Sequence, residues 1–230
     1  YLHYPNFTKV VGVSKFHEEL LKKESNSLFN YTPLQTQQYI HSIDNAIDIN
    51  EYNSTLNNKV KGRIIWSSSP DRGLELILTN WKKWKEKRND LSLVICSPPY
   101  SKDWFNTDIS NYPDVEWLGS LSSVRLREEQ SKAEYWVYAS NYTETYCITA
   151  LEMMIQKVKI ITNGTGNIKN LIADGERGIM IDKIDPDVIL EYLVGDIKNR
   201  LLAYRWCQMS ERAYEYAKSQ SWENRVQEWL

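Results

Sequence analysis

Short apolar runs alternate with longer amphipathic segments along most of this chain. The runs are rich in β-branched and aromatic residues, and most of them close with Ser, Asn, Pro or Gly, which is typical of buried β-strands. We expect strands at residues 10–14, 39–43, 63–67, 91–96, 115–118, 134–139, 158–162 and 178–181.

The segments between these runs carry a helical period. In residues 73–88 the apolar side chains recur every three or four positions, so they share one face of a helix. This face holds Leu74, Ile77, Leu78, Trp81 and Trp84. Residues 123–133 and 147–156 predict two more helices, and residues 187–230 are nearly all helical, with Ser221 as the N-cap of the last segment.

This alternation of strands and helices predicts an α/β fold, a Rossmann-like parallel sheet with helices on both faces. The polar stretch at residues 50–62 reads as a linker, so we expect residues 63–230 to form the main domain and residues 1–49 to belong to a second unit. Residue 1 is Tyr, and an apolar run begins at residue 10, so we expect a part of a longer polypeptide.

Composition and charge remove several classes of function. The net charge of −2 gives no broad basic field, which argues against nucleic-acid binding. The three cysteines are widely spaced and show no metal-binding spacing, so we expect no metal site and a reducing, cytoplasmic setting. No apolar run reaches the roughly 18 residues of a membrane span. The basic run at residues 81–88 is either a membrane-surface patch or a solvated helix face with core tryptophans, and the second interpretation is favoured.

The loop after strand 63–67 could bind a phosphate. Its small polar residues include Ser68, Pro70 stiffens it, and Gly73 opens the following helix with Arg72 beside it. Free amides at a helix start favour an anion, and a guanidinium can contact two phosphate oxygens. The alternative is an ordinary loop in which Arg72 is solvated. In the loop after strand 115–118, main-chain groups around Gly119 and Leu121 could face a flat base, or the loop is only a turn that leads to a helix cap.

Two carboxylates flank the junction between strand 134–139 and the next helix. We expect that helix to begin near Tyr146, so that free amides point into a cleft; these belong to Thr145, Tyr146, Cys147 and Ile148. Glu144 would lie beside this positive helix end and could hold sugar hydroxyls. Glu152 stands inside an apolar helix and needs a partner, which is either a ribose diol or a salt bridge.

Several blocks, in their order along the chain, resemble the C-terminal half of the GT-B glycosyltransferases of the retaining, GT4-like type. The core of the resemblance is a Glu-x7-Glu element in "ETYCITALE", from Glu144 to Glu152. Further blocks are "VVGVSKF", "DNAIDINEY", "SSSPDRGLELIL", "VEWLGSLSS" and "GTGNIKNLIADGERGIMI". Together they cover nearly the whole chain.

The resemblance implies a glycosyltransferase that takes its sugar from a nucleoside-diphosphate donor, without a metal or other cofactor. Arg72 would bind the diphosphate, Glu144 the transferred sugar and Glu152 the ribose, with Arg72 and Glu144 as the catalytic pair. Ser68, Gly119, Leu121, Thr145, Tyr146, Cys147 and Ile148 would complete the donor site. The partners implied are the donor, a carbohydrate or glycoconjugate acceptor and the remainder of a longer polypeptide. In this family the final helix crosses back, so we expect it to pack on residues 1–49 through Trp222 and Trp229.

The sequence also departs from the family pattern. Ser67 or Trp66 stands where a second basic residue is common, Asn170 replaces an acid, and most of the N-terminal domain is absent. Two other functions therefore remain open. One is a non-catalytic module that binds a nucleotide or a partner, and the other is an epimerase of the same fold, whose motifs fit less well.

Overall fold

A computed structural model describes residues 9–52, 58–98 and 107–230. Its main unit is a six-stranded sheet in the order β5-β4-β3-β6-β7-β8, and all its strands are parallel. The strands are β3 (Arg63–Trp66), β4 (Ser92–Cys96), β5 (Val115–Gly119), β6 (Tyr135–Tyr138), β7 (Lys159–Thr162) and β8 (Ile179–Met180). Strand–helix alternation thus gives the predicted Rossmann-like fold.

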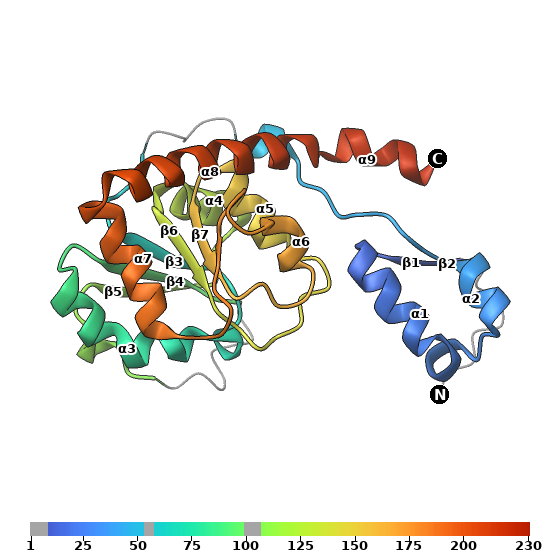
Figure 1. Cartoon of the computed structure of the whole chain (residues 1–230), viewed down its shortest axis with the longest axis horizontal. Coiled ribbons are helices and arrows are strands. Elements are labelled where there is room, and N and C mark those ends of the chain that lie inside the picture. The colour runs from blue at the N-terminus through green and yellow to red at the C-terminus, as the bar shows by residue number, and fades with distance from the viewer. Residues whose placement is uncertain (1–8, 53–57, 99–106) are drawn as a thin grey trace.

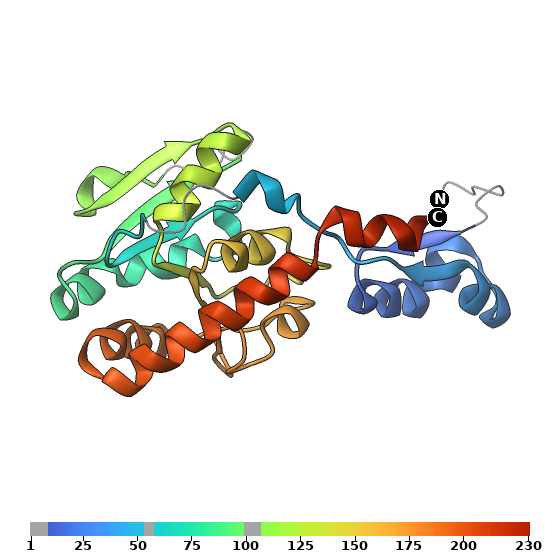
Figure 2. The same cartoon turned by 90° about the horizontal axis from the view of Figure 1, so that it is seen from above.

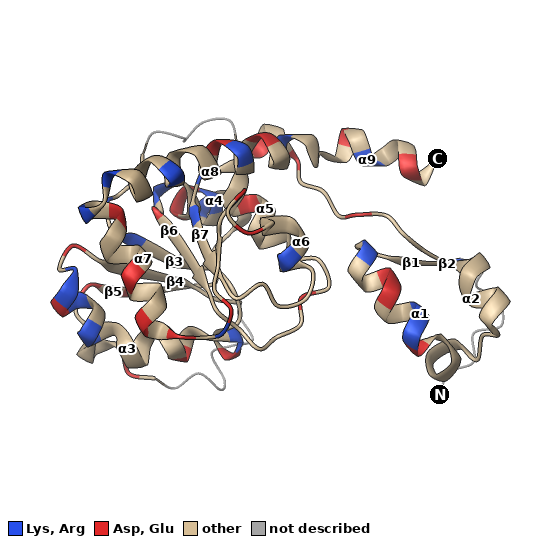
Figure 3. Cartoon of the chain, viewed as in Figure 1, with Lys and Arg blue, Asp and Glu red and all other residues tan. Residues whose placement is uncertain are grey.

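Helices surround this sheet (Figure 1). They are α3 (Leu74–Lys87), α4 (Ser123–Lys132), α5 (Ile148–Ile155), α6 (Ile168–Ile172), α7 (Pro186–Lys198) and α8 (Arg200–Ser219). Helix α3 packs against α7, while α5 packs against α4, α6 and the long α8. The side chains of Trp81 and Trp84 on α3 are fully buried, so the basic run at residues 81–88 contains core tryptophans, as the favoured interpretation held. Figure 3 shows Lys and Arg interspersed with Asp and Glu along the helices.

A smaller N-terminal unit lies beside the main one (Figure 1). Strands β1 (Val10–Gly12) and β2 (Ile40–Ser42) lie where the apolar runs predicted strands, and they pair as a two-stranded parallel sheet. The same unit contains α1 (Lys15–Phe29) and α2 (Pro33–Tyr39), which the apolar pattern did not predict. Helix α1 escapes the pattern because its buried residues include Glu18, which ion pairs with Lys15 and Lys22 instead of packing as an apolar side chain.

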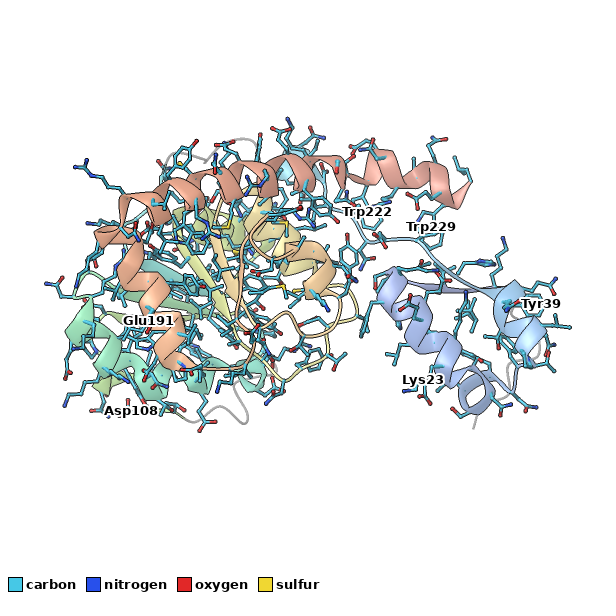
Figure 4. All side chains as sticks on the ribbon, in the orientation of Figure 1. Lys23, Tyr39, Asp108, Glu191, Trp222 and Trp229 are labelled. Carbon is cyan, nitrogen blue, oxygen red and sulfur yellow. The ribbon has the colours of Figure 1, made fainter. Side chains whose placement is uncertain are left out.

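The last helix, α9 (Trp222–Trp229), extends beyond the sheet and lies beside the N-terminal unit (Figures 1 and 2). Ser221 is its N-cap, as predicted, and accepts from the amide of Asn224. Packing through the two tryptophans was expected, but Trp222 and Trp229 are 45% and 58% exposed (Figure 4). The junction is made instead by backbone hydrogen bonds at Ile47 and by an Arg225–Asp44 ion pair. Within the described ranges no helix combines the length and apolar composition that a membrane crossing requires.

A buried arginine fastens the amino-terminal edge of the sheet to two helices. Arg88 follows α3, and its side chain has no exposed surface. The guanidinium donates to the Tyr135 hydroxyl, to the Leu193 carbonyl on α7 and to the carboxylates of Asp90 and Glu134. Because a buried guanidinium needs such partners, this cluster fixes α3, β6 and α7 relative to one another.

We expect Arg88→Met to lower the free energy of unfolding by about 3 kcal/mol, because it leaves buried polar partners without a donor. Urea unfolding followed by circular dichroism measures this loss. Lys82→Met is the matched control, because Lys82 lies exposed on α3. Equal losses for the two variants would show that the Arg88 cluster does not hold the fold.

Candidate functional site

The order of the strands reverses between β3 and β6, and this reversal positions the candidate site. From β3 the chain adds β4 and then β5 on one side, whereas β7 and β8 follow β6 on the other. The loops that leave the carboxyl ends of β3 and β6 therefore diverge, and a crevice opens between them, which is where open parallel sheets bind ligands. These two loops carry Arg72 and Glu144.

A cavity of about 250 Å³ occupies this crevice, and we call it the β3–β6 cavity. It is lined by Asn45, Ser68, Arg72, Trp136, Tyr138, Glu144, Thr145, Tyr146, Cys147, Ile148 and Thr149. The structure thus brings the residues expected from the phosphate-binding loop together with those expected from the Glu144 segment. Asn45 comes from the N-terminal part of the chain, and Ser14 also reaches this segment, because its hydroxyl donates to the Thr145 carbonyl.

Glu144 is a largely buried carboxylate, 9% exposed, whose Oε1 has two donors. Arg72 Nη1 lies 3.1 Å from this oxygen, and the Tyr138 hydroxyl lies 2.6 Å from it. The guanidinium of Arg72 also stacks on the ring of Tyr142, with 3.9 Å from Cζ to the ring centroid. The charge of Glu144 is thereby paired, as a buried charge must be.

The backbone of Glu144 is held by the loop after β7. Glu144 and Gly166 form an isolated parallel β-bridge, and the amide of Asn167 donates to the Glu144 carbonyl at 2.8 Å. Gly166 has φ +69°, and a Cβ on it would lie 2.4 Å from the Glu144 carbonyl oxygen. Only glycine meets both requirements without strain, so Gly166 sets how closely this loop approaches Glu144.

Helix α5 begins at Ile148, two residues later than expected. Cys147 is its N-cap and has left-handed backbone geometry, with φ 76°, so Thr145 and Tyr146 precede the helix. Among the described residues, the amides of Ile148 and Thr149 have no hydrogen-bond partner, and both residues line the β3–β6 cavity. Burial raises the pKa of the Cys147 thiol, so this side chain stays protonated at neutral pH.

Glu152 lies in a neighbouring cavity of about 360 Å³, which we call the Glu152 cavity. Ile148 separates the two, since it lines both of them. Gln130 Nε2 donates to Glu152 Oε2 at 2.9 Å, and the Tyr52 hydroxyl lies 3.5 Å from Oε1. Burial raises the pKa of Glu152, while the donors Gln130 and Tyr52 oppose that shift. The hydrogen-bond partner of Glu152 at Oε2 is thus the side-chain amide of Gln130 and not a cation.

The loop expected to face a base follows β5 and lies outside the two cavities. Gly119 ends β5, and its carbonyl accepts from the amide of Ser97 at 2.9 Å. Leu121 packs against the core, and Ser122 caps α4, as expected, by accepting from the amide of Arg125. Within the described part of the chain, neither Gly119 nor Leu121 lines the two cavities.

Sequence reasoning missed Tyr138, Trp136, Gln130 and Tyr52. Tyr138 and Trp136 stand two positions apart on β6, so they share one face of the strand, a relation that the sequence does contain. Gln130 and Tyr52 carried no such signal, because both reach Glu152 from distant parts of the chain. Across the described residues, no three His, Cys, Asp or Glu side chains converge as a metal site would require.

We expect Gly166→Ala to lower the free energy of unfolding by about 1–3 kcal/mol more than Gly164→Ala, as measured by urea unfolding. Both glycines have positive φ, so the backbone cost is shared. A Cβ on Gly164 meets the flexible tip of Met180, whereas one on Gly166 meets the Glu144 backbone. Similar losses for both variants would refute the close-approach argument.

Comparison with known proteins identifies the family of this chain. The model of the family described as glycosyl transferases group 1 matches residues 61–220. A lipopolysaccharide 1,2-N-acetylglucosaminetransferase of Salmonella typhimurium is 25% identical over 171 residues, which cover 69% of this chain and 44% of that protein. The chain therefore spans less than half the length of this curated relative.

Solved structures show the same fold. TarM has a TM-score of 0.72 at 18% identity, over 97% of this chain and 43% of that one. The pneumococcal O-GlcNAc transferase GtfA, solved with UDP and GlcNAc, has a TM-score of 0.71 at 14% identity, over 96% and 44%.

A third solved structure is that of a separate C-terminal domain, and nearly all of it matches this chain. It is the C-terminal domain of LpcC, a glycosyl transferase group 1 family protein from Francisella tularensis, with a TM-score of 0.61 at 16% identity. The match covers 76% of this chain and 98% of that domain. The main unit therefore has the fold of a GT-B C-terminal domain, and because the family model matches most of the chain, the chain belongs to the group 1 glycosyl transferases.

Proposed function

We propose that this chain is the donor-binding part of a retaining glycosyltransferase that moves a sugar from a nucleoside diphosphate to an acceptor hydroxyl. One observation carries the proposal. A guanidinium, a carboxylate and two unpaired helix amides share the β3–β6 cavity, and a second carboxylate occupies the cavity next to it. This arrangement of groups suits an anionic diphosphate that lies between a sugar and a ribose.

In this proposal Arg72 and the start of α5 bind the diphosphate. The amides of Ile148 and Thr149 and the guanidinium stabilise the negative charge that develops on the leaving group, so the transfer needs no metal. Ser68, Thr145, Tyr146 and Cys147 line the same pocket. The bond from the anomeric carbon to the phosphate oxygen breaks, the acceptor oxygen bonds to that carbon from the same face, and the hydroxyl proton passes to the departing diphosphate.

In the proposal the two carboxylates bind the two ends of the nucleotide sugar. Glu144 accepts hydrogen bonds from the transferred sugar, and Glu152 accepts from the ribose. Main-chain groups around Gly119 and Leu121 face the base. UDP is the first nucleotide to test, because GtfA, which has the same fold, was solved with it.

Residues 63–230 would then form the donor domain, residues 50–62 the linker, and residues 1–49 an acceptor-side segment. The acceptor is a carbohydrate or glycoconjugate, and the remainder of a longer polypeptide would complete its site. We propose a cytoplasmic location, since the three cysteines form no disulfide.

Titration calorimetry with UDP, GDP, ADP and TDP tests the donor site. We expect one nucleotide to bind selectively and Arg72→Ala to weaken that binding by about 1.5–3 kcal/mol, the range for charged hydrogen bonds. Glu152→Ala should weaken it as well. Arg205→Ala removes the same charge from an exposed position outside both cavities and serves as the control.

Two outcomes would contradict this expectation. If Arg72→Ala and Arg205→Ala bind with equal affinity, Arg72 does not contact the diphosphate. If wild-type protein binds none of the four nucleotides, the donor-site proposal fails for this chain. A non-catalytic module that binds a partner protein then becomes the better explanation.

The sugar contact has its own test. We expect Glu144→Gln to weaken the binding of UDP-N-acetylglucosamine at least fivefold while the affinity for UDP stays the same or rises, because Arg72 is freed from its ion pair. Calorimetry of both ligands gives the two affinities. A parallel loss for UDP and for the sugar nucleotide would show that Glu144 does not contact the sugar.

A further inference from the structure

Tyr138 is a buried donor that touches the carboxylate assigned to the sugar. It is the last residue of β6 and is 1% exposed. Its hydroxyl donates to Glu144 Oε1 at 2.6 Å, and this is the same oxygen that Arg72 Nη1 contacts at 3.1 Å. The two donors thus share one carboxylate oxygen and leave Oε2 without either of them.

The ring of Tyr138 is held firmly. It stacks on Trp136 with 4.9 Å between the ring centroids and 15° between the planes. It also stacks on Trp66 of β3, at 5.7 Å and 28°. Both tryptophans have no exposed surface, so the stack is part of the core and fixes where the hydroxyl points.

The hydroxyl is also a permanent donor. Burial raises the pKa of Tyr138, and the hydrogen bond to Glu144 adds to that shift. The phenol therefore stays protonated at neutral pH, and its O–H group donates a hydrogen bond to the carboxylate. A hydrogen bond of this kind, to a charged acceptor, is among the stronger ones in proteins.

Arg72 is a different kind of partner. Its side chain keeps 28% of its surface exposed, and it stacks on Tyr142, which is itself 46% exposed. An arginine at the rim of a cavity can turn toward a diphosphate without disturbing the core. In the complex with the nucleotide sugar that we propose, Arg72 would then lose contact with Glu144. The carboxylate would keep only the hydrogen bond from the buried Tyr138 hydroxyl.

We propose that Tyr138 is the positioning residue that holds Glu144 through Oε1, so that Oε2 faces the sugar while Arg72 is free to bind the diphosphate. This inference rests on the proposed function and deepens it. In this arrangement the two parts of the nucleotide sugar have separate ligands. Arg72, at the rim of the cavity, binds the diphosphate, and Glu144, held by the core, binds the sugar. Tyr138 acts through Glu144 and not by touching the donor.

The test compares wild type with Tyr138→Phe, which keeps the stacked ring and removes only the hydroxyl. Calorimetry measures the affinities for UDP and for UDP-N-acetylglucosamine, and thermal unfolding checks that the variant is folded. We expect the ratio of the sugar-nucleotide affinity to the UDP affinity to fall about fivefold to tenfold, which is less than the full contribution of a hydrogen bond to a charged group because Tyr138 acts on the sugar only through Glu144.

A double-mutant cycle with Glu144→Gln separates action through Glu144 from direct contact with the donor. In the Glu144→Gln background, Tyr138→Phe should change the ratio less than twofold. The same change in both backgrounds would overturn the inference, and so would an unchanged ratio in the single variant. A loss of affinity for UDP itself that persists in the Glu144→Gln background would instead place the hydroxyl on the diphosphate and also overturn it.

The same experiment distinguishes this inference from the proposed function. If wild-type protein binds UDP and the ratio does not respond to Tyr138→Phe, only the role of Tyr138 is wrong. If wild-type protein binds neither UDP nor UDP-N-acetylglucosamine, the donor site that we propose for these ligands is wrong and the inference fails with it.

Discussion

The pairing of one buried carboxylate organises the carboxyl edge of this sheet. Glu144 is too deeply buried to be left without partners, since an unpaired charge there would cost several kcal/mol. Two segments meet to satisfy this charge, because the loop after β3 brings Arg72 and the end of β6 brings Tyr138. The loop after β7 holds the backbone of Glu144 next to Gly166. The crevice keeps its shape because these segments are tied to one another through Glu144.

The two ends of the sheet handle charge in different ways. At the amino-terminal edge Arg88 is fully buried and bonded to helix, strand and loop, an arrangement that suits stability and little else. At the carboxyl edge Arg72 has one ion pair and a stacked ring, and part of its surface faces solvent. A cation held by few contacts can exchange them for a ligand, whereas Arg88 could not leave its partners without unfolding its surroundings.

The sequence predicts this fold well where the physics is local. Every expected strand was found within a residue or two of its place, because β-branched and aromatic runs mark buried strands wherever they pair. Helices α1 and α2 were not predicted, since α1 buries Glu18 in an ion-pair cluster that no hydrophobic period reveals. In the site, the motif named Arg72, Glu144 and Glu152, but Tyr138 looked like one more core aromatic. Gln130 was missed because its contact with Glu152 joins α4 to α5, and no local pattern encodes such a contact.

The junction between the two units has a mechanical consequence. Residues 43–52 leave the N-terminal unit, and the passage from α8 into α9 is bonded to them where Ile47 meets Gln220 and Trp222. A single tether lets two bodies swing and twist about any axis. Backbone hydrogen bonds from both the amide and the carbonyl of Ile47 remove the torsional freedom of the connecting segment at that point. Any movement of the N-terminal unit relative to the β3–β6 cavity would therefore turn about other points of the segment, and it would break the hydrogen bond from the Ser14 hydroxyl to the Thr145 carbonyl.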